Sequence, residues 1–338
     1  MTALPTGRTI LTGDRPTGPL HLGHYAGSLA NRVALQNTGT NVMTILVADT
    51  QALTDNARDP EKIRRNVLAV VEDYLAVGIH PDLTTIALQS ELRALPEIAS
   101  LYANLVPVGQ LERNPTIRAE ITQRGFGHAV PAGFLCYPIA QAADITGFDA
   151  DLVPAGEDQA PLIELTNDVV GKINAIAGRD VLRPCALLTG QGARLPGVDG
   201  KGKMSKSAGN SIPLSADADT VRAQVMAMYT DSNHLRVSDP GQVEGNVVFA
   251  FLDAFDAHQD EVAALKDHYR AGGLGDMALK RRLVDVLVAT MDPIRARRAS
   301  IDEDMCRTVL HIGTQRAQGI TENMRDVVRK VFGLSSFF

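Results

Sequence analysis

The chain has 338 residues, of which 45% are hydrophobic and 21% are charged. This length fits two domains, and the composition is typical of a globular protein, so disordered, collagen-like and membrane classes are disfavoured. The net charge of −6 argues against a protein that coats nucleic acids without specificity, although a local basic cluster can still bind RNA.

Cysteine usage and hydropathy favour a cytoplasmic protein. The cysteines Cys136, Cys185 and Cys306 are far apart and form no CxxC pair, so they predict neither a disulfide framework nor a zinc site. The amino terminus lacks a cationic start followed by an apolar run, and no stretch reaches the roughly 18 apolar residues of a spanning helix. We therefore expect no secretion signal, no protein-bound metal, and no membrane or DNA partner.

The first half of the chain alternates strands with helices. Apolar runs of strand length lie around residue 10, at 42–48 and at 84–88. Helical periodicity begins near His21 and again after Asp59, a typical N-cap that a proline follows. This alternation predicts a Rossmann-like α/β fold with a doubly wound parallel sheet, in which ligands lie beyond the carboxyl ends of the strands.

The second half, after about residue 210, shows only helical periodicity. We expect a sheet-bearing domain at 1–210 and an all-helical domain at 211–338. The segment 190–211 holds six glycines and predicts a mobile loop between them. Basic residues are in excess near the carboxyl terminus, and their densest cluster is Arg295, Arg297 and Arg298. This cluster favours a surface that faces RNA, although exposed helices often carry such charges.

The first candidate motif is the loop Pro16-Thr17-Gly18-Pro19-Leu20-His21-Leu22-Gly23-His24. His21 and His24 are three residues apart, so at the start of a helix their rings share one face and can bind phosphate near the exposed N–H groups. Gly23 leaves room for a purine or ribose to approach the backbone. Taken alone, two surface histidines at a helix start are the simpler interpretation.

The second candidate motif, Lys203-Met204-Ser205-Lys206-Ser207, lies in the glycine-rich segment. Two lysines flanked by hydroxyl groups can neutralise a pyrophosphate leaving group, and the glycines permit the loop to close over it. Most lysine-bearing loops simply face solvent, so this motif alone is weak support for a function.

Together, the two motifs resemble the HIGH and KMSKS signatures of class I aminoacyl-tRNA synthetases, and they occur in the expected order. Three further segments resemble the tryptophanyl members: Ala142-Ala143-Asp144-Ile145, Pro154-Ala155-Gly156-Glu157-Asp158-Gln159 and Glu164-Leu165-Thr166. The resemblance covers essentially the whole chain, most firmly residues 12–210. It implies ATP with Mg²⁺, L-tryptophan and tRNA(Trp) as substrates and partners, a homodimer, and anticodon binding by the helical domain.

The resemblance also implies the site residues. The catalytic residues would be Lys203, Lys206, His21 and His24. The residues expected around ATP are Arg15, Pro16, Thr17, Gly23, His24, Gly156, Glu157, Asp158, Leu195, Lys203, Met204, Ser205, Lys206 and Ser207. For tryptophan, Asp144 would accept the indole N–H, Tyr137 and Gln159 would hold the ammonium group, and Gln141 would lie beside the substrate.

The chain departs from the usual tryptophanyl pattern at Asp14, Arg15, His24 and Gln141, which indicates a divergent branch. Arg15 is compatible both with a phosphate contact and with an ion pair to Asp14. Asp144 is also compatible with capping a neighbouring loop, although a buried carboxylate is costly without a dedicated partner. Two other functions remain open, a smaller nucleotidyltransferase of the HIGH superfamily and a regulatory protein descended from a synthetase.

Overall fold

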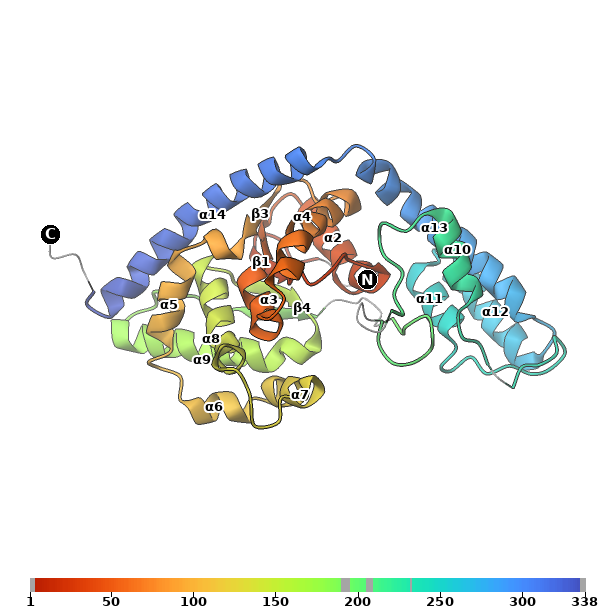
Figure 1. Cartoon of the computed structure of the whole chain (residues 1–338), viewed down its shortest axis with the longest axis horizontal. Helices are drawn as coiled ribbons and strands as arrows, with labels where there is room; N and C mark the ends of the chain where they lie inside the picture. The colour runs from red at the N-terminus through yellow and green to blue at the C-terminus, as the bar shows by residue number, and fades with distance from the viewer. Residues whose placement is uncertain (1–3, 190–194, 205–208, 232, 335–338) are drawn as a thin grey trace.

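A five-stranded parallel sheet forms the centre of the computed structural model, which describes residues 4–189, 195–204, 209–231 and 233–334 (Figure 1). The strands are β1 (Thr9–Asp14), β2 (Val42–Val47), β3 (Thr84–Leu88), β4 (Leu152–Ala155) and β5 (Ala186–Thr189). Their order across the sheet is β3-β2-β1-β4-β5. The direction of winding reverses at β1, which pairs with β2 on one side and β4 on the other. This order confirms the predicted Rossmann-like fold.

Helices connect the strands of this sheet. They are α1 (Leu22–His24), the π-helix η1 (Tyr25–Leu29), α2 (Ala30–Asn37), α3 (Asp49–Asn56), α4 (Pro60–Val77), the 3-10 helix η2 (Gln89–Glu91), α5 (Ala94–Tyr102), α6 (Val108–Arg113), α7 (Pro115–Arg124), α8 (Ala132–Gly147), the 3-10 helix η3 (Glu157–Gln159) and α9 (Ala160–Ala177). Helix α4 begins as predicted, because the Asp59 carboxylate accepts a hydrogen bond from the Lys62 N–H at 3.1 Å. The helix predicted from His21 is divided by the π-helical turn, which sequence periodicity does not reveal.

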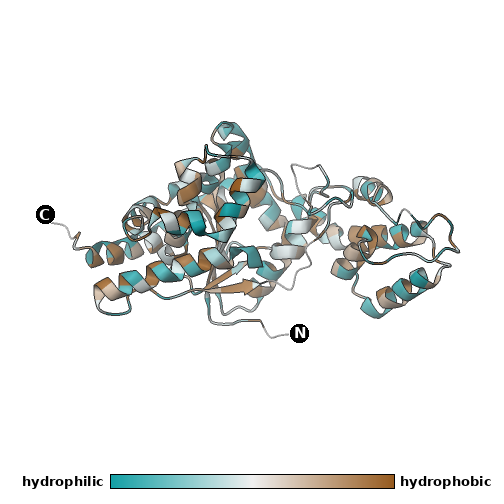
Figure 2. Ribbon diagram, turned by 90° about the horizontal axis from the view of Figure 1, so that it is seen from below, coloured by the Kyte–Doolittle hydropathy of each residue, from teal (hydrophilic) through white to brown (hydrophobic). Residues whose placement is uncertain are grey.

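The described residues after β5 form helices and loops, which confirms the predicted helical region. The helices are α10 (Ala218–Met226), α11 (Val247–Phe255), α12 (Gln259–Ala271), α13 (Asp276–Arg298) and α14 (Glu303–Val331). Figure 1 shows α10 to α13 at one end of the molecule and α14 running back along the sheet-bearing part. Figure 2 shows mixed hydrophobic and hydrophilic colouring along these helices, as expected where one face packs inward. No helix among the described residues is long and apolar enough to span a membrane.

One hydrophobic core joins the sheet to the helical region. Ile10 and Ile45 of the sheet belong to the same buried cluster as Leu279, Leu283 and Leu287 of α13. Helix α13 packs against α4, and α14 packs against β3 and α5. The expected domain boundary at residue 210 therefore stays a prediction, and the hydrophobic core is continuous across it.

The arginine cluster at the end of α13 contacts α4 and is only partly exposed. The Arg297 Nε donates a hydrogen bond to the carbonyl oxygen of Ala76 at 2.7 Å. The Arg298 guanidinium pairs with Glu72 and Asp73, and Arg295 pairs with Asp292. The ion pairs of Arg298 with Glu72 and Asp73 occupy its guanidinium, which contradicts an RNA-facing role for that residue. Arg297 remains exposed, so its predicted role stays a prediction. Charge clustering in a sequence does not distinguish a surface from an interface between helices.

Helix α14 covers the exposed edge of the sheet at β3. A Cβ atom built on Gly313 would lie 2.0 Å from the carbonyl oxygen of Ile86, so only glycine permits this approach. The next residue, Thr314, accepts a hydrogen bond from the Leu88 N–H at 3.0 Å through its Oγ1. The helix thus satisfies a backbone group that an edge strand would otherwise leave unpaired.

We expect Gly313→Ala to destabilise the fold by about 1 to 3 kcal/mol, because the added methyl group forces α14 away from β3. Gly319→Ala on the same helix is the matched control, since a Cβ there meets no atom within 4 Å. The control should stabilise the protein by up to about 1 kcal/mol through helix propensity. Urea unfolding of both variants measures the difference, and equal effects would contradict the packing argument.

Candidate active site

The candidate active site lies at the carboxyl edge of the sheet, where the winding reverses between β1 and β4. Asp14 ends β1 and Ala155 ends β4, so the loops that follow these strands begin side by side. Gln89 follows β3 and Asp49 follows β2 at the same edge. Ligands of doubly wound sheets bind in this position. Both predicted segments that follow strands, around Arg15 and around Gly156, are therefore placed where the fold puts a ligand.

Asp14 anchors the start of the signature loop, by which we mean residues 15–20 between β1 and α1. Its Oδ2 accepts hydrogen bonds from Arg32 Nη1 at 2.5 Å and from the Tyr74 hydroxyl at 2.7 Å. Burial raises the pKa of Asp14, but the charge of Arg32, the neighbouring His24 ring and the hydrogen bonds from Arg32 and Tyr74 outweigh it and lower the pKa to about 2. The carboxylate is therefore ionised throughout the physiological range.

Arg15 binds a partner that the sequence did not indicate. Its Nη1 lies 3.1 Å from Oδ2 of Asp55 on α3, and Arg124 Nη2 at the end of α7 lies 2.5 Å from the same oxygen. The Asp55 side chain is buried, with 2% of its surface exposed. An ion pair between Arg15 and Asp14 is therefore wrong. Two arginines share one carboxylate here.

The first motif folds as a short helix start with interlocked histidines. The His21 Nδ1 accepts a hydrogen bond from the Gly23 N–H at 3.1 Å, and the His24 Nδ1 accepts one from the His21 N–H at 3.2 Å. Because both Nδ1 atoms act as acceptors, each neutral ring carries its proton on Nε2. The ring centroids are 3.8 Å apart. His21 is only 4% exposed, so the interpretation of two surface histidines is wrong.

The second motif packs directly against the first. Gly23 is required by this packing, since a Cβ atom there would lie 2.9 Å from the His21 ring and 3.3 Å from the Met204 sulfur. The Met204 side chain is buried, and its N–H donates to the carbonyl oxygen of Leu195 at 3.2 Å. Pro196 and Lys203 form an antiparallel bridge beside this bond. The structure therefore brings Gly23, Leu195 and Met204 together, with Lys203 exposed at the same hairpin.

Backbone pairing also links the two motifs. The Leu22 N–H donates to the carbonyl oxygen of Ile212, and the Leu214 N–H donates to that of Leu20. The segment that follows the second motif is thus paired with the first. The predicted residues Ser205, Lys206 and Ser207 lie outside the described residues, as do 190–194 of the segment expected to be a mobile loop.

Three predicted tryptophan-binding residues share one face of α8. Tyr137, Gln141 and Asp144 are spaced by four and three residues, which places their side chains on one side of the helix. The Tyr137 hydroxyl donates to Glu120 Oε2 at 2.8 Å. Gln141 Nε2 donates to Gln159 Oε1 at 3.4 Å, so α8 contacts the loop after β4.

The loop after β4 carries the rest of the predicted set. Gln159 Nε2 donates to Asp158 Oδ2 at 3.1 Å. The Asp158 carbonyl oxygen accepts from Thr116 Oγ1 on α7 at 2.8 Å, which fixes the loop from outside. Gly156, Glu157 and Asp158 are exposed at the carboxyl edge of the sheet, whereas Pro16 is buried and Thr17 half-buried on the signature loop. Both loops therefore border the same edge.

Asp144 is a buried carboxylate that pairs with no cation among the residues that the structure describes. It is 7% exposed, and its Oδ2 accepts a hydrogen bond from Gln89 Nε2 at 2.7 Å. Burial raises the pKa of Asp144 to about 7, which the Gln89 hydrogen bond only partly opposes. Its second oxygen, Oδ1, accepts no hydrogen bond from any residue that the structure describes. The loop-capping interpretation of Asp144 is wrong, because its partner is a side chain.

Sequence reasoning missed Gln89. This residue holds Asp144 and is itself fixed by α3, because its Oε1 accepts from Thr50 Oγ1 at 2.6 Å and from the Gln51 N–H at 3.0 Å. Its position directly after β3 was the available signal, since that places it at the ligand edge of a parallel sheet. Gln89 therefore orients the Asp144 carboxylate.

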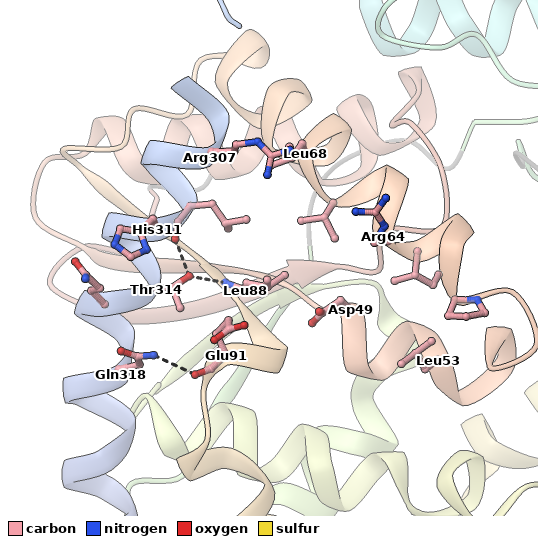
Figure 3. Close-up of a pocket in the computed structure, with 15 residues that line it drawn as sticks. Asp49, Leu53, Arg64, Leu68, Leu88, Glu91, Arg307, His311, Thr314 and Gln318 are labelled. Carbon is pink, nitrogen blue, oxygen red and sulfur yellow. Dashed lines mark hydrogen bonds between the residues drawn. The ribbon is translucent and has the colours of Figure 1, made fainter. Parts of the chain in front are cut away.

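A separate cavity of about 850 Å³ lies between α3, α4 and α14. Leu53, Leu68 and Leu88 are among its lining residues, with Arg64 and Arg307 also labelled around it in Figure 3. None of the predicted site residues lines it. Within the described ranges, no group of three or more His, Cys, Asp or Glu side chains is placed to hold a metal ion.

Comparison with known proteins gives the same family throughout. The family model described as "tRNA synthetases class I (W and Y)" matches residues 7–291. The chain is 51% identical over 332 residues to the tryptophan–tRNA ligase of Clostridium longisporum, and the match covers 97% of each chain. It is 50% identical over 335 residues to the tryptophan–tRNA ligase of Streptococcus agalactiae, covering 97% of this chain and 98% of the relative.

Solved structures agree with these relatives. A crystal structure of the Campylobacter jejuni tryptophanyl-tRNA synthetase complexed with ADP and tryptophan superposes with a TM-score of 0.81 at 26% identity, covering 96% of this chain and 100% of that one. The family match, the relatives and the shared fold lead to one conclusion. The chain belongs to the class I tRNA synthetases of the tryptophan and tyrosine group.

Proposed function

We propose that this chain is a tryptophan–tRNA ligase, which activates L-tryptophan with ATP and then transfers it to tRNA(Trp). The observation that carries the proposal is the environment of Asp144. An indole ring presents one N–H donor and no acceptor, which suits a buried carboxylate with one oxygen held by Gln89 and one oxygen left to accept. A tyrosine phenol both donates and accepts, and phenylalanine does neither. The names of the relatives from Clostridium and Streptococcus support the same substrate.

The proposed activation step needs no protein nucleophile. The tryptophan carboxylate attacks the α-phosphorus of ATP, a carboxylate oxygen–phosphorus bond forms, and the bond to the departing pyrophosphate breaks. Tyr137 and Gln159 would hold the substrate ammonium group, with Gln141 supporting Gln159. Binding both reactants at one edge of the sheet would lower the entropic part of the activation barrier.

Charge stabilisation would come from both motifs. ATP would lie over Arg15, Pro16, Thr17, Gly23, Gly156, Glu157, Asp158 and Leu195, with Lys203 to Ser207 on the phosphates. His21 and His24 would donate to phosphate oxygens, and Lys203 and Lys206 would balance the charge of the leaving pyrophosphate. Mg²⁺ would enter with ATP as the counter-ion of its phosphates.

The transfer step would place tRNA across the helical region 211–338. Because Arg298 is paired with Glu72 and Asp73 of α4, RNA contacts would use exposed residues of that region such as Arg297. We further propose that the enzyme acts in the cytoplasm as a homodimer. These assignments follow from family membership and not from a contact in this chain.

The substrate is tested by ATP–pyrophosphate exchange with each of the twenty amino acids. We expect exchange with tryptophan alone, and a loss of discrimination against phenylalanine in Asp144→Ala. A site built around one hydrogen bond can reject an analogue that lacks it by roughly 10⁴-fold. A preference of the wild type for tyrosine, or full discrimination in Asp144→Ala, would contradict the assignment.

Tryptophan affinity should depend on pH through Asp144. The pKa of this group is about 7, and only its ionised form is a full acceptor for indole. If that form alone binds, affinity should rise about tenfold between pH 6 and pH 8. The chain contains no tryptophan, so the fluorescence of the ligand itself reports binding. Asp144→Ala is the control, because any dependence that it retains belongs to other groups such as the two histidines.

The contribution of Asp144 to the free energy of unfolding should decrease as pH rises. Its folded pKa lies above the ordinary value of 3.8, so the folded state binds the proton more tightly than the unfolded chain. Its contribution to stability is therefore greatest below pH 4 and declines toward pH 7 and above. Saturating tryptophan should reduce this decline, because binding favours the ionised form.

Lys206→Ala should raise the activation free energy of adenylate formation by about 3 kcal/mol, comparable to the loss of one oxyanion donor. The effect should appear in kcat and leave the fluorescence-detected tryptophan affinity unchanged, since the lysine is assigned to the leaving group. An unaltered exchange rate would remove the second motif from the mechanism.

A further inference from the structure

Neighbouring residues on α4 hold the signature loop at both ends. The Tyr74 hydroxyl donates to Asp14, the residue before the loop, at 2.7 Å. Asp73, which is fully buried, accepts through Oδ2 a hydrogen bond from the N–H of Leu20 at 2.7 Å. Leu20 is the last residue of the loop and immediately precedes the first histidine of the motif. One turn of α4 therefore sets the span of the loop.

The other oxygen of Asp73 belongs to the helical region. Arg298, near the end of α13, donates from Nη1 to Asp73 Oδ1 at 2.5 Å and from Nη2 to Glu72 Oε2 at 2.7 Å. The adjacent Arg297 binds the carbonyl oxygen of Ala76 on the same helix. Asp73 is thus shared between a backbone N–H of the signature loop and a guanidinium of α13.

The two hydrogen bonds of Asp73 depend on one another. Burial raises the pKa of Asp73, while the Leu20 N–H and the charge of Arg298 act in the opposite direction. Removing the guanidinium would leave a buried, uncompensated carboxylate, which must then take up a proton or move toward water. Either response weakens its hold on Leu20.

We propose that Asp73 is a positioning residue for the signature loop and that Arg298 links the placement of α13 to that loop. The inference rests on the proposed function, which assigns the loop to ATP. A displacement of α13 relative to α4 would change the loop between Arg15 and His21 before it changed the tryptophan site on α8. The ATP site should respond to the helical region through this pair.

The test compares Arg298→Gln with Arg282→Gln. The control removes a pair of similar burial, because Arg282 binds Asp256, whose side chain is 2% exposed, and both residues lie within the helical region. For Arg298→Gln we expect kcat/KM for ATP in pyrophosphate exchange to fall about tenfold or more, with tryptophan affinity by fluorescence within twofold of wild type. Arg298→Lys should recover part of the loss, because it retains one charged donor.

Hydrogen–deuterium exchange gives a readout that does not require activity. In the unliganded protein, peptides covering residues 14–24 should exchange about tenfold faster in Arg298→Gln than in wild type, and at the wild-type rate in Arg282→Gln. Asp73→Asn should have the same effect, and adding Arg298→Gln to it should cause little further change.

Several results would overturn the inference. These are unchanged exchange in residues 14–24 of Arg298→Gln, an equal acceleration there in Arg282→Gln, or unaltered ATP kinetics in an Arg298→Gln protein whose unfolding free energy has fallen. If Arg298→Gln does not fold, the ATP kinetics and the deuterium exchange are measured on Arg298→Lys. Both should then change in the same direction as expected for Arg298→Gln, but by less. Absence of pyrophosphate exchange in the wild type would instead contradict the proposed function, and the deuterium result would still decide whether the pair positions the loop.

Discussion

Two carboxylates, one half-buried and one fully buried, fix the ends of the loop on which the candidate site depends. Asp14 and Asp73 bind the two ends of the signature loop, and each is matched by a guanidinium, from Arg32 and Arg298 respectively. Burying a charge costs several kcal/mol unless hydrogen bonds and an opposite charge replace the lost water. Here, each carboxylate receives both a cation and a second donor. The loop therefore has a defined conformation before any ligand arrives.

A third carboxylate follows the opposite rule. Asp144 has Gln89 as its partner and no cation, so its charge is compensated less completely than that of Asp14. The contrast separates two uses of the same side chain. A structural carboxylate is satisfied within the fold, whereas a carboxylate with remaining acceptor capacity is suited to receive a donor from outside. The specificity of the site would arise because the Asp144 carboxylate lacks a hydrogen bond until a ligand donor supplies it.

Local patterns in the sequence predicted local structure well. The start of α4 at Asp59 and the strand at 84–88 follow from capping and periodicity. The contact between the two motifs agrees with what the family resemblance implied. Pairings between distant elements were not predictable. Arg298 and Asp73 are 225 residues apart in sequence, and an arginine cluster has the same composition whether it faces solvent or another helix. Gln89 was missed because one amide after a strand has no spacing pattern to identify it.

The return of α14 to the sheet has a consequence for how the chain folds during synthesis. Strand β3 ends at residue 88, but the side chain that satisfies its Leu88 N–H comes from Thr314. More than two hundred residues must leave the ribosome before this edge can be covered. Until then the nascent protein presents an open strand edge, which is a site for pairing with other chains. Such long-range closure also slows folding, so the risk of pairing with other chains is greatest in this interval of translation.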